Sequence, residues 1–280
     1  MLISSFYASC RRLIALSLIS GVVLTNFASA NECSLKVGVV PQFEQRRLLA
    51  TWDPILSKLQ EQTACSYQLV GSKSISEFEE KFLAGEFDLA YLNPYHSIMA
   101  HAAQGYVPLA RSGEKKLLGI LVVRKDSPVT DVKELDGQEI AFPSPNALGA
   151  SLLMRAELAL KHGINIKPRY VKTHSSVYLH VVKKLTEAGG GVGRTLKEQK
   201  DTIKDKLRVL YKTTPVNAHP LVIHPRVPNE KQLEIQSAFL ALNEQNPEML
   251  ALIPMKSPIK ATLEDYADLK AMELESFVGK

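Results

Sequence analysis

The 280-residue sequence lacks the features that mark several large classes of protein. No stretch approaches the roughly eighteen consecutive apolar residues that a transmembrane helix needs. There is no G-x-S-x-G nucleophile elbow and no H-E-x-x-H zinc motif, so neither a hydrolytic nucleophile nor a local metal clamp is visible. We therefore expect no membrane span, no metal, no cofactor and no catalytic residue.

The beginning of the chain is typical of an export signal. Arg11 and Arg12 form a charged n-region, Leu13–Leu24 is a short apolar run, and Ala28-Ser29-Ala30 is a small-residue cleavage site. We expect cleavage near Ala30, so that residues 1–30 are absent from a mature protein in the periplasm.

An excess of charge of one sign is also missing. Removal of the signal takes two arginines away and leaves 32 basic and 29 acidic side chains, a formal charge of +3. These charges are spread along the chain, whereas a surface that follows nucleic-acid phosphates needs a concentrated basic face. The balance argues against a nucleic-acid partner.

Cysteine is scarce too, since cleavage leaves only Cys33 and Cys65. Each stands just before a predicted strand, Leu35–Val40 and Tyr67–Val70, with one amphipathic helix between them. In a right-handed βαβ unit these strand starts lie side by side. Because an exported protein folds in an oxidising compartment, we expect a disulfide between them, worth roughly 3–4 kcal/mol by loop-closure entropy.

Strands and helices alternate along the mature chain, which is typical of mostly parallel sheets with helices on both faces. A capping box, Ser76-x-x-Glu79, is predicted to open the helix that ends at Gly85. In the helix 230–246, Leu233, Ala238, Phe239 and Leu242 are predicted to face inward. Further strands are predicted at 87–92, 120–124, 139–142, 169–172, 207–211 and 221–223, and further helices at 48–59, 94–103, 147–162, 178–185 and 263–278.

Two α/β sections joined by extended segments at 118–123 and 213–222 predict two lobes with two hinge crossings between them. The first lobe comprises residues 31–120 and 218–280, and the second comprises residues 121–217. In such sheets ligands bind beyond the carboxyl ends of the strands, where helix N-termini converge. We therefore expect the ligand in the cleft between the lobes.

The stretch Asp136–Leu153 is the most suggestive of these strand-to-helix connections. A strand, Glu139–Phe142, runs into a helix that starts near Ala147, and either Ser144 or Asn146 could be its N-cap. The start of a helix directs unpaired N–H groups and the positive end of its dipole toward an anion. An ordinary βα connection is the competing interpretation.

Other predicted strand ends are also rich in hydrogen-bond donors. Gln42 and Phe43 end the first strand, Asn93-Pro94-Tyr95-His96 follows the third, and Thr173–Tyr178 follows strand 169–172. Core packing is the competing interpretation for Tyr95. Among the histidines, His174 and His219 stand in loops that should face the cleft. The glycine run 189–193 before Arg194 indicates either a close backbone approach or a flexible strand.

Taken together, these motifs resemble the PhnD-like substrate-binding proteins of bacterial ABC importers for phosphate, phosphite or phosphonate. The resemblance covers the whole mature chain and implies the two-lobed type II periplasmic binding protein fold. The segments that carry it are VGVVPQ at 37–42, GEFDLAYLNPYH at 85–96, LVVRKDSPV at 121–129, DGQEIAFPSPNALGAS at 136–151, YVKTHSSVY at 170–178 and HPLVIHPRVP at 219–228.

The resemblance also implies where the ligand is bound. Family contacts fall on Tyr91–Tyr95, Asn146–Gly149, His174 and His219. Where phosphonate binders usually carry a run of hydroxyls this chain has Ala147-Leu148-Gly149, and His219 replaces a common aspartate, which argues against an aminophosphonate. The full predicted ligand-binding set is Gln42, Phe43, Tyr91, Asn93, Tyr95, His96, Ser144, Asn146, Ala147, Leu148, Gly149, His174, Ser175, Tyr178, Arg194 and His219.

The leading hypothesis is therefore a monomeric periplasmic protein that captures a small oxyanion and presents it to an ABC permease. Arg194 is the nearest candidate cation, so backbone dipoles would carry most of the ligand's charge, which favours a singly charged oxyanion. Two alternatives remain at this point: a ligand-sensing subunit of a membrane histidine kinase for phosphorus or arsenic oxyanions, and an enzyme built on the same clamshell.

Overall fold

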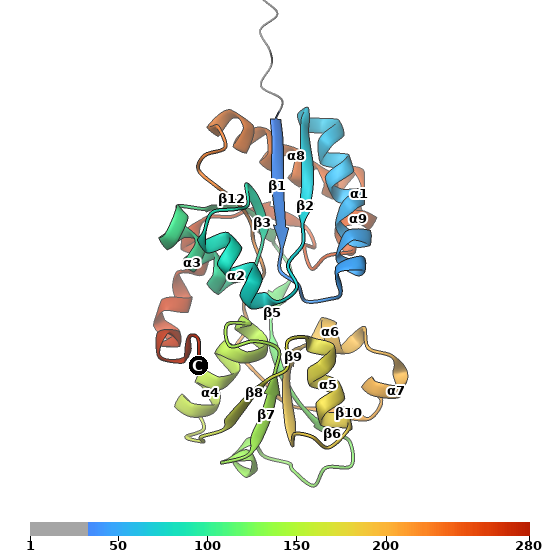
Figure 1. Ribbon diagram of the computed structural model, residues 1–280, viewed down its shortest axis with the longest axis vertical. Helices are drawn as coiled ribbons and strands as arrows, with labels where there is room; N and C mark the ends of the chain where they lie inside the picture. Colours follow the sequence, from blue (N-terminus) through green and yellow to red (C-terminus); the bar gives the residue numbers. More distant parts are fainter. Residues whose placement is uncertain (1–32) are drawn as a thin grey trace, which may run out of the picture. The chain divides into compact units, whose positions relative to one another are not determined.

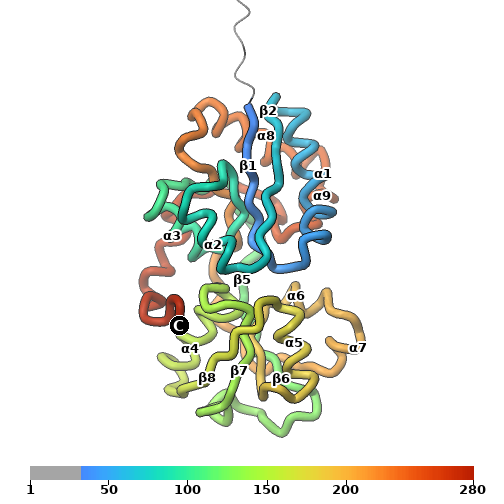
Figure 2. Tube along the Cα trace, in the orientation of Figure 1, coloured from blue at the N-terminus to red at the C-terminus, as the bar shows by residue number. Residues whose placement is uncertain are grey.

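The computed structural model describes residues 33–280, and the predicted export signal lies outside the described residues. Within this range the strands form three sheets, two large and one small (Figure 1). The strand order is β13-β4-β12-β3-β1-β2 in the six-stranded sheet, β10-β6-β9-β7-β8 in the five-stranded sheet, and β11-β5 in the two-stranded sheet. Figure 2 follows the chain as it leaves the first large sheet for the second and later returns.

The six-stranded sheet is built from both ends of the described chain. β1 pairs in parallel with β2 and β3, whereas β12 runs antiparallel between β3 and β4. Helices α1 and α8 contact each other, as do α2 and α3. The bounds are β1 (Cys33–Val39), α1 (Gln45–Thr63), β2 (Cys65–Val70), α2 (Ile75–Leu83), β3 (Leu89–Tyr91), α3 (Pro94–Gln104), β4 (Val107–Ser112), β12 (Leu221–Ile223), α8 (Asn229–Gln245), α9 (Pro247–Ala251) and β13 (Pro258–Lys260).

Apolar periodicity fixes which helix faces are buried. In α1, Leu48, Trp52 and Ile55 are buried at helical spacing, and the Trp52 ring packs 5.0 Å from the Tyr91 ring of β3. The prediction for α8 was wrong at Leu233, which is 63% exposed. Ile235 is buried in its place, because it lies on the same face as Ala238, Phe239 and Leu242.

The predicted cap of α2 is also wrong. Ser74, two residues earlier, is the N-cap, and its hydroxyl accepts a hydrogen bond from the Glu77 N–H at 3.1 Å. The S-x-x-E spacing occurs twice in this segment, at Ser74/Glu77 and at Ser76/Glu79. Only Ser74 has the extended backbone of an N-cap, with φ −148° and ψ 165°.

Cys33 and Cys65 are joined by a disulfide in the structure. They are the first residues of β1 and β2, directly opposite each other in the parallel register, and their Cα atoms are 4.5 Å apart. This end of the sheet is the amino end of the strands, opposite the edge where α1 and α2 begin.

The five-stranded sheet is built from the middle of the chain. β7 pairs in parallel with β8 and β9, whereas β6 runs antiparallel to β9 and β10. α5 contacts β9 and β7, and α4 contacts β6. The bounds are β6 (Gly119–Arg124), η1 (Val132–Leu135), β7 (Glu139–Phe142), η2 (Leu148–Leu152), α4 (Leu153–Leu160), β8 (Lys167–Tyr170), α5 (His174–Val182), β9 (Ala188–Val192), α6 (Gly193–Lys197), α7 (Asp201–Lys204) and β10 (Leu207–Lys212).

The glycine run forms the buried strand β9 rather than a flexible segment. A Cβ atom at Gly190 would lie 2.0 Å from the Ala150 carbonyl oxygen and 2.5 Å from the Phe142 ring. At Gly191 it would lie 2.2 Å from the Tyr178 hydroxyl. Glycine therefore allows η2 and α5 to pack directly on the strand backbone.

The chain passes between the two large sheets through β5 (Lys116–Leu117) and β11 (Val216–Asn217), which pair antiparallel. The last segment adds a further link: η3 (Leu263–Met272) contacts α3, and η4 (Leu274–Phe277) contacts α4. Both are 3₁₀ helices and lie within the helical segment predicted at 263–278.

Candidate functional site

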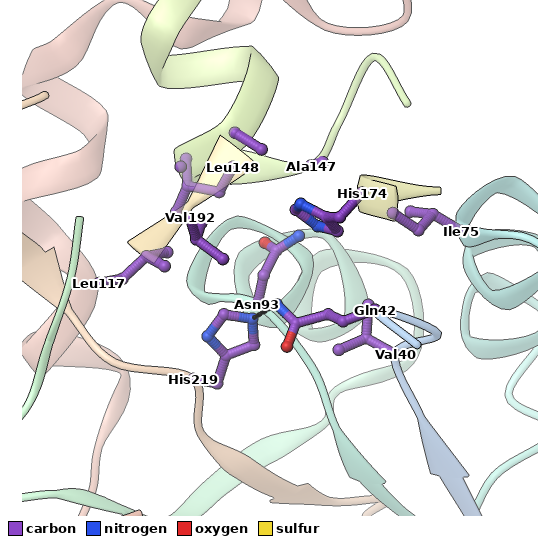
Figure 3. A pocket seen from close by; sticks show the side chains of 12 residues that line it. Val40, Gln42, Ile75, Asn93, Leu117, Ala147, Leu148, His174, Val192 and His219 are labelled. Atoms are coloured by element: carbon purple, nitrogen blue, oxygen red, sulfur yellow. Dashed lines mark hydrogen bonds between the residues drawn. The ribbon is translucent and has the colours of Figure 1, made fainter. Parts of the chain in front are cut away.

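A small cavity lies where the carboxyl ends of β1, β2, β3, β7 and β8 converge (Figure 3). Its volume is about 20 Å³, and one water molecule needs roughly 10–15 Å³. Elements of both large sheets contribute to its wall. The lining residues are Val40, Gln42, Ile75, Asn93, Leu117, Ala147, Leu148, Gly149, Ala150, His174, Val192 and His219.

Four helix starts meet at this cavity. α2 begins at Ile75, α3 has Asn93 as its N-cap, η2 begins at Leu148 and leads into α4, and α5 begins at His174. The first N–H groups of a helix have no partner within it, and they carry the positive end of the helix dipole. The arrangement is therefore suited to an anion.

The start of η2 offers the most backbone donors. Its first turn is a π turn, in which Leu152 N–H donates to the Ala147 carbonyl at 3.2 Å. Among residues 33–280, the N–H groups of Leu148, Gly149 and Ala150 have no hydrogen-bond acceptor. Three adjacent donors of this kind can surround one oxyanion.

Neither residue predicted to cap this helix does so. Ala147 is the N-cap and has no side-chain hydrogen bond to give. The Asn146 side chain instead donates to Glu79 at 3.0 Å and accepts from the Gly279 N–H at 2.9 Å. The Ser144 hydroxyl is buried without a partner in the described part of the chain. The N-cap, Ala147, stands one residue after Asn146 and three after Ser144, so neither side chain caps the helix and its first N–H groups stay free.

Side-chain donors come mainly from the six-stranded sheet. Asn93 accepts from the His96 N–H at 2.9 Å as the α3 cap, and its amide donates to the Asn146 carbonyl at 3.1 Å. The Gln42 amide nitrogen lies 3.3 Å from His219 Nε2. Figure 3 shows these side chains side by side, across the cavity from His174.

The two histidines of the cavity are buried, with 2% exposure at His174 and 4% at His219. Burial lowers the pKa of His174 to about 4. Burial, with smaller contributions from nearby cationic groups, lowers the pKa of His219 to about 3. Both rings are therefore neutral at pH 7, and each offers one N–H donor and one acceptor.

No lysine, arginine, aspartate or glutamate is among the lining residues of this cavity in residues 33–280. The ligand's charge would be balanced by N–H dipoles and amide groups alone. A neutral ring that can also accept a hydrogen bond suits an oxyanion that keeps one proton.

Seven of the predicted ligand-binding residues line the cavity. Three more lie next to it: Phe43, Tyr91 and Arg194 line an adjoining cavity, in which the Arg194 guanidinium lies 5.8 Å from the Phe43 ring centre. Tyr91 also stacks on His219, with ring centres 5.5 Å apart. The residues in the lining itself are Gln42, Asn93, Ala147, Leu148, Gly149, His174 and His219.

Six predicted residues lie outside both cavities, and all of them except Ser144 have side chains that contact other groups. Ser144 and Asn146 are described above, and the His96 ring bonds Glu79 at 3.0 Å. Tyr95 packs in an apolar cluster with Leu148 and Tyr266, the competing interpretation for this residue. The Tyr178 hydroxyl bonds the Val192 carbonyl and Thr195, and Ser175 accepts from Gln199.

Five residues that were not predicted also line the cavity: Val40, Ile75, Leu117, Ala150 and Val192. Four of them are apolar residues next to predicted strand or helix ends and have no distinguishing side chain. Ile75 had a usable signal, because the S-x-x-E pair at Ser74 places it at a helix start.

Residues 37–266 match the family model described as "ABC transporter, phosphonate, periplasmic substrate-binding protein". The chain belongs to this PhnD-like family. Members are substrate-binding components of transporters rather than enzymes, and they are periplasmic. Among the helices of residues 33–280, none has the length and apolar character to cross a membrane. No curated protein matches the sequence.

Solved structures share the type II periplasmic binding protein fold. A binding protein component of an ABC phosphonate transporter from Pseudomonas aeruginosa has a TM-score of 0.78 at 14% identity, over 87% of this chain and 86% of that one. PhnD1 from Prochlorococcus marinus, in complex with methylphosphonate, has a TM-score of 0.77 at 17% identity, over 85% of this chain and 96% of that one. A Xanthomonas citri protein bound to ATP has a TM-score of 0.70 at 16% identity, over 88% of this chain and 100% of that one.

Proposed function

We propose that this protein captures a small phosphorus oxyanion in the cavity and delivers it to an ABC permease. The observation that carries the proposal is the meeting of four helix starts and two neutral histidines around a space without fixed charge. The proposed class of ligand is phosphate, phosphite or phosphonate. The family description, which names phosphonate, and the structure of PhnD1 with methylphosphonate support it. The family also favours an importer over a sensor.

The geometry of the small cavity favours an oxyanion group with one negative charge. The Leu148–Ala150 N–H groups would bind the charged oxygens, while His174 accepts a hydrogen bond from a protonated oxygen. His219 already accepts from the Gln42 amide through Nε2 and would act as a donor. A fully deprotonated ligand would leave a ring nitrogen facing a lone pair, which costs binding energy. We therefore expect the affinity to rise and fall with pH in proportion to the fraction of the ligand whose oxyanion group carries a single negative charge.

We further propose that the two large sheets are the cores of two lobes that close on the ligand about the β5 and β11 crossings. Contacts between elements of the two sheets support this proposal. Asn93 donates to the Asn146 carbonyl, Asn146 donates to Glu79, and Arg47 pairs with Glu198. The proposed boundaries are residues 31–120 with 218–280, and 121–217.

A thermal-shift screen of mature protein, followed by calorimetry, tests the proposed function. The panel is phosphate, phosphite, methylphosphonate, sulfate, arsenate and arsenite. A ligand present at a hundred times its dissociation constant should add roughly 2.7 kcal/mol to the free energy of unfolding. A response to amino acids or sugars and to none of the oxyanions would overturn the proposal.

The Gly149→Leu variant tests the location of the site. Gly149 lines the cavity, and even a Cβ atom there would lie 3.3 Å from Gly119 N and the Leu117 side chain. We expect a loss of affinity of at least about tenfold, measured by calorimetry on protein whose circular dichroism is unchanged. Unchanged affinity would place the ligand elsewhere.

A further inference from the structure

A second cavity adjoins the small one and has the positive charge that the small one lacks. Its volume is about 180 Å³. The two cavities share Gln42, Leu117, Val192 and His219. In Figure 3, Leu117, Val192 and His219 lie at the left of the view, opposite Ile75. A group bound in the small cavity could therefore extend past these residues into the larger one.

The remaining wall of the second cavity contains Lys115, Lys116 and Arg194, and we call this cavity the basic vestibule. Lys115 is exposed and has no ion-pair partner among residues 33–280. The Lys116 ammonium donates to the Asn217 side chain, a neutral group. Arg194 pairs with Glu198 at 2.8 Å.

Carboxylates close to the vestibule are already paired. Glu198 bonds Arg47 as well as Arg194, and Glu114 pairs with Lys256 at 2.6 Å. In the described part of the chain no aspartate or glutamate lines the vestibule. The two lysines therefore give it an uncompensated positive potential, in contrast to the uncharged small cavity.

We propose that the basic vestibule binds a second anionic group of an elongated ligand, whose phosphonate or phosphate head occupies the small cavity. This inference rests on the proposed function and narrows its ligand to oxyanions that carry a carboxylate or second acidic group on a short linker. The vestibule has the room for such a tail. An uncharged tail would gain only contact area there, and a cationic tail would be repelled.

Calorimetry with phosphonates of similar size tests this assignment. Propylphosphonate has an uncharged tail, 3-phosphonopropionate a carboxylate, and 2-aminoethylphosphonate an ammonium group. We expect 3-phosphonopropionate to bind about threefold to tenfold more tightly than propylphosphonate, and 2-aminoethylphosphonate to bind most weakly. The difference should shrink in about 0.5 M salt, because the lysines are exposed.

A double variant, Lys115→Gln with Lys116→Gln, identifies the residues responsible. It should abolish the preference for the carboxylate while the affinity for methylphosphonate stays within about twofold of wild type. Lys125→Gln is the matched control, since it removes the same charge at an exposed position at the end of β6, outside both cavities.

Equal affinity for the uncharged and carboxylated ligands in wild-type protein would overturn the vestibule assignment. An equal loss for methylphosphonate and 3-phosphonopropionate in the double variant would do the same. In both cases the proposed function would stand, because methylphosphonate is bound. If none of these phosphonates is bound while phosphate or phosphite is, the vestibule assignment is wrong and the proposed function stands. If none of the oxyanions in the thermal-shift panel is bound either, both proposals are wrong.

Discussion

The two sides of the cavity present their hydrogen-bond donors in different ways. The six-stranded sheet contributes side chains, chiefly Gln42, Asn93 and His219, and its helix starts are closed by the side-chain caps Ser74 and Asn93. The five-stranded sheet contributes mainly backbone, because η2 starts at Ala147 without a side-chain cap, although α5 on the same side is capped by Thr173. At an uncapped helix start, the N–H donors that a cap would use remain available to a ligand. Such a helix start must be held in place by close packing against neighbouring backbone instead.

Gly190→Val should break the backbone side of the cavity. The new side chain would meet the Ala150 carbonyl oxygen and the Phe142 ring, so we expect a loss of about 3 kcal/mol in the free energy of unfolding, measured with urea. Gly193→Ala is the control, because a Cβ atom there meets nothing within 4 Å. Equal stability of the two variants would show that η2 does not depend on the glycine strand.

Asn93→Asp should weaken ligand binding on the side of the cavity that presents side chains, while the N-cap of α3 is kept. The carboxylate can still accept from the His96 N–H, but it cannot donate to the Asn146 carbonyl and it brings a negative charge to the cavity. We expect an affinity about a hundredfold lower for the oxyanion that wild type binds, measured by calorimetry. If affinity is unchanged, Asn93 does not face the ligand.

The two buried histidines should make stability fall in acid. Their folded-state pKa values, about 4 for His174 and about 3 for His219, lie below the unfolded value, so the unfolded chain binds more protons. Stability is full above about pH 6.5 and declines as the pH falls toward the folded-state values. Each histidine should lower the free energy of unfolding by about 2 kcal/mol as the pH falls from about 7.5 to about 5.

Urea unfolding at these two pH values, on wild type and on His174→Gln, checks this expectation. The variant should lose about half of the histidine-dependent change in the free energy of unfolding. An identical pH dependence in both proteins would mean that folding leaves the pKa of His174 unchanged.

Ser74→Ala should have the smallest effect and tests the capped helix start directly. Loss of the hydrogen bond to the Glu77 N–H should cost about 1 kcal/mol in unfolding free energy. Ser76→Ala is the matched control and should change stability by less than about 0.5 kcal/mol, because Ser76 is exposed. If Ser76→Ala lowers the free energy of unfolding more than Ser74→Ala does, Ser76 is the N-cap, as the sequence first indicated.

Local patterns in the sequence predicted most of the fold. Strand Glu139–Phe142 and strand Leu221–Ile223 have the predicted bounds, because each is a short apolar run between turn residues. Leu233 was assigned to the wrong face: it stands two and a half turns before Leu242, on the opposite side of α8, and it is exposed. The 3₁₀ geometry of 263–277 depends on contacts with α3 and α4, which no local pattern contains.

The site was predictable only at the level of loops. Strand ends drew attention to Gln42, Asn93, the turn at Ala147 and His174, all of which line the cavity. The direction of each side chain was not predictable, because it depends on partners far away in sequence. His96 faces Glu79 and Tyr178 faces Thr195, although both stand within a few residues of lining positions.

The segment 274–280 is hydrogen-bonded to residues close to the cavity. The Phe277 carbonyl accepts from Arg155, the Gly279 N–H donates to Asn146, and the Lys280 carbonyl accepts from Tyr170. Asn146 directly precedes the uncapped turn that begins at Ala147. An environment-sensitive dye attached at Val278 would lie next to this turn and outside the lining of the small cavity. A change in its emission when a ligand is added would show that binding alters the surroundings of the turn.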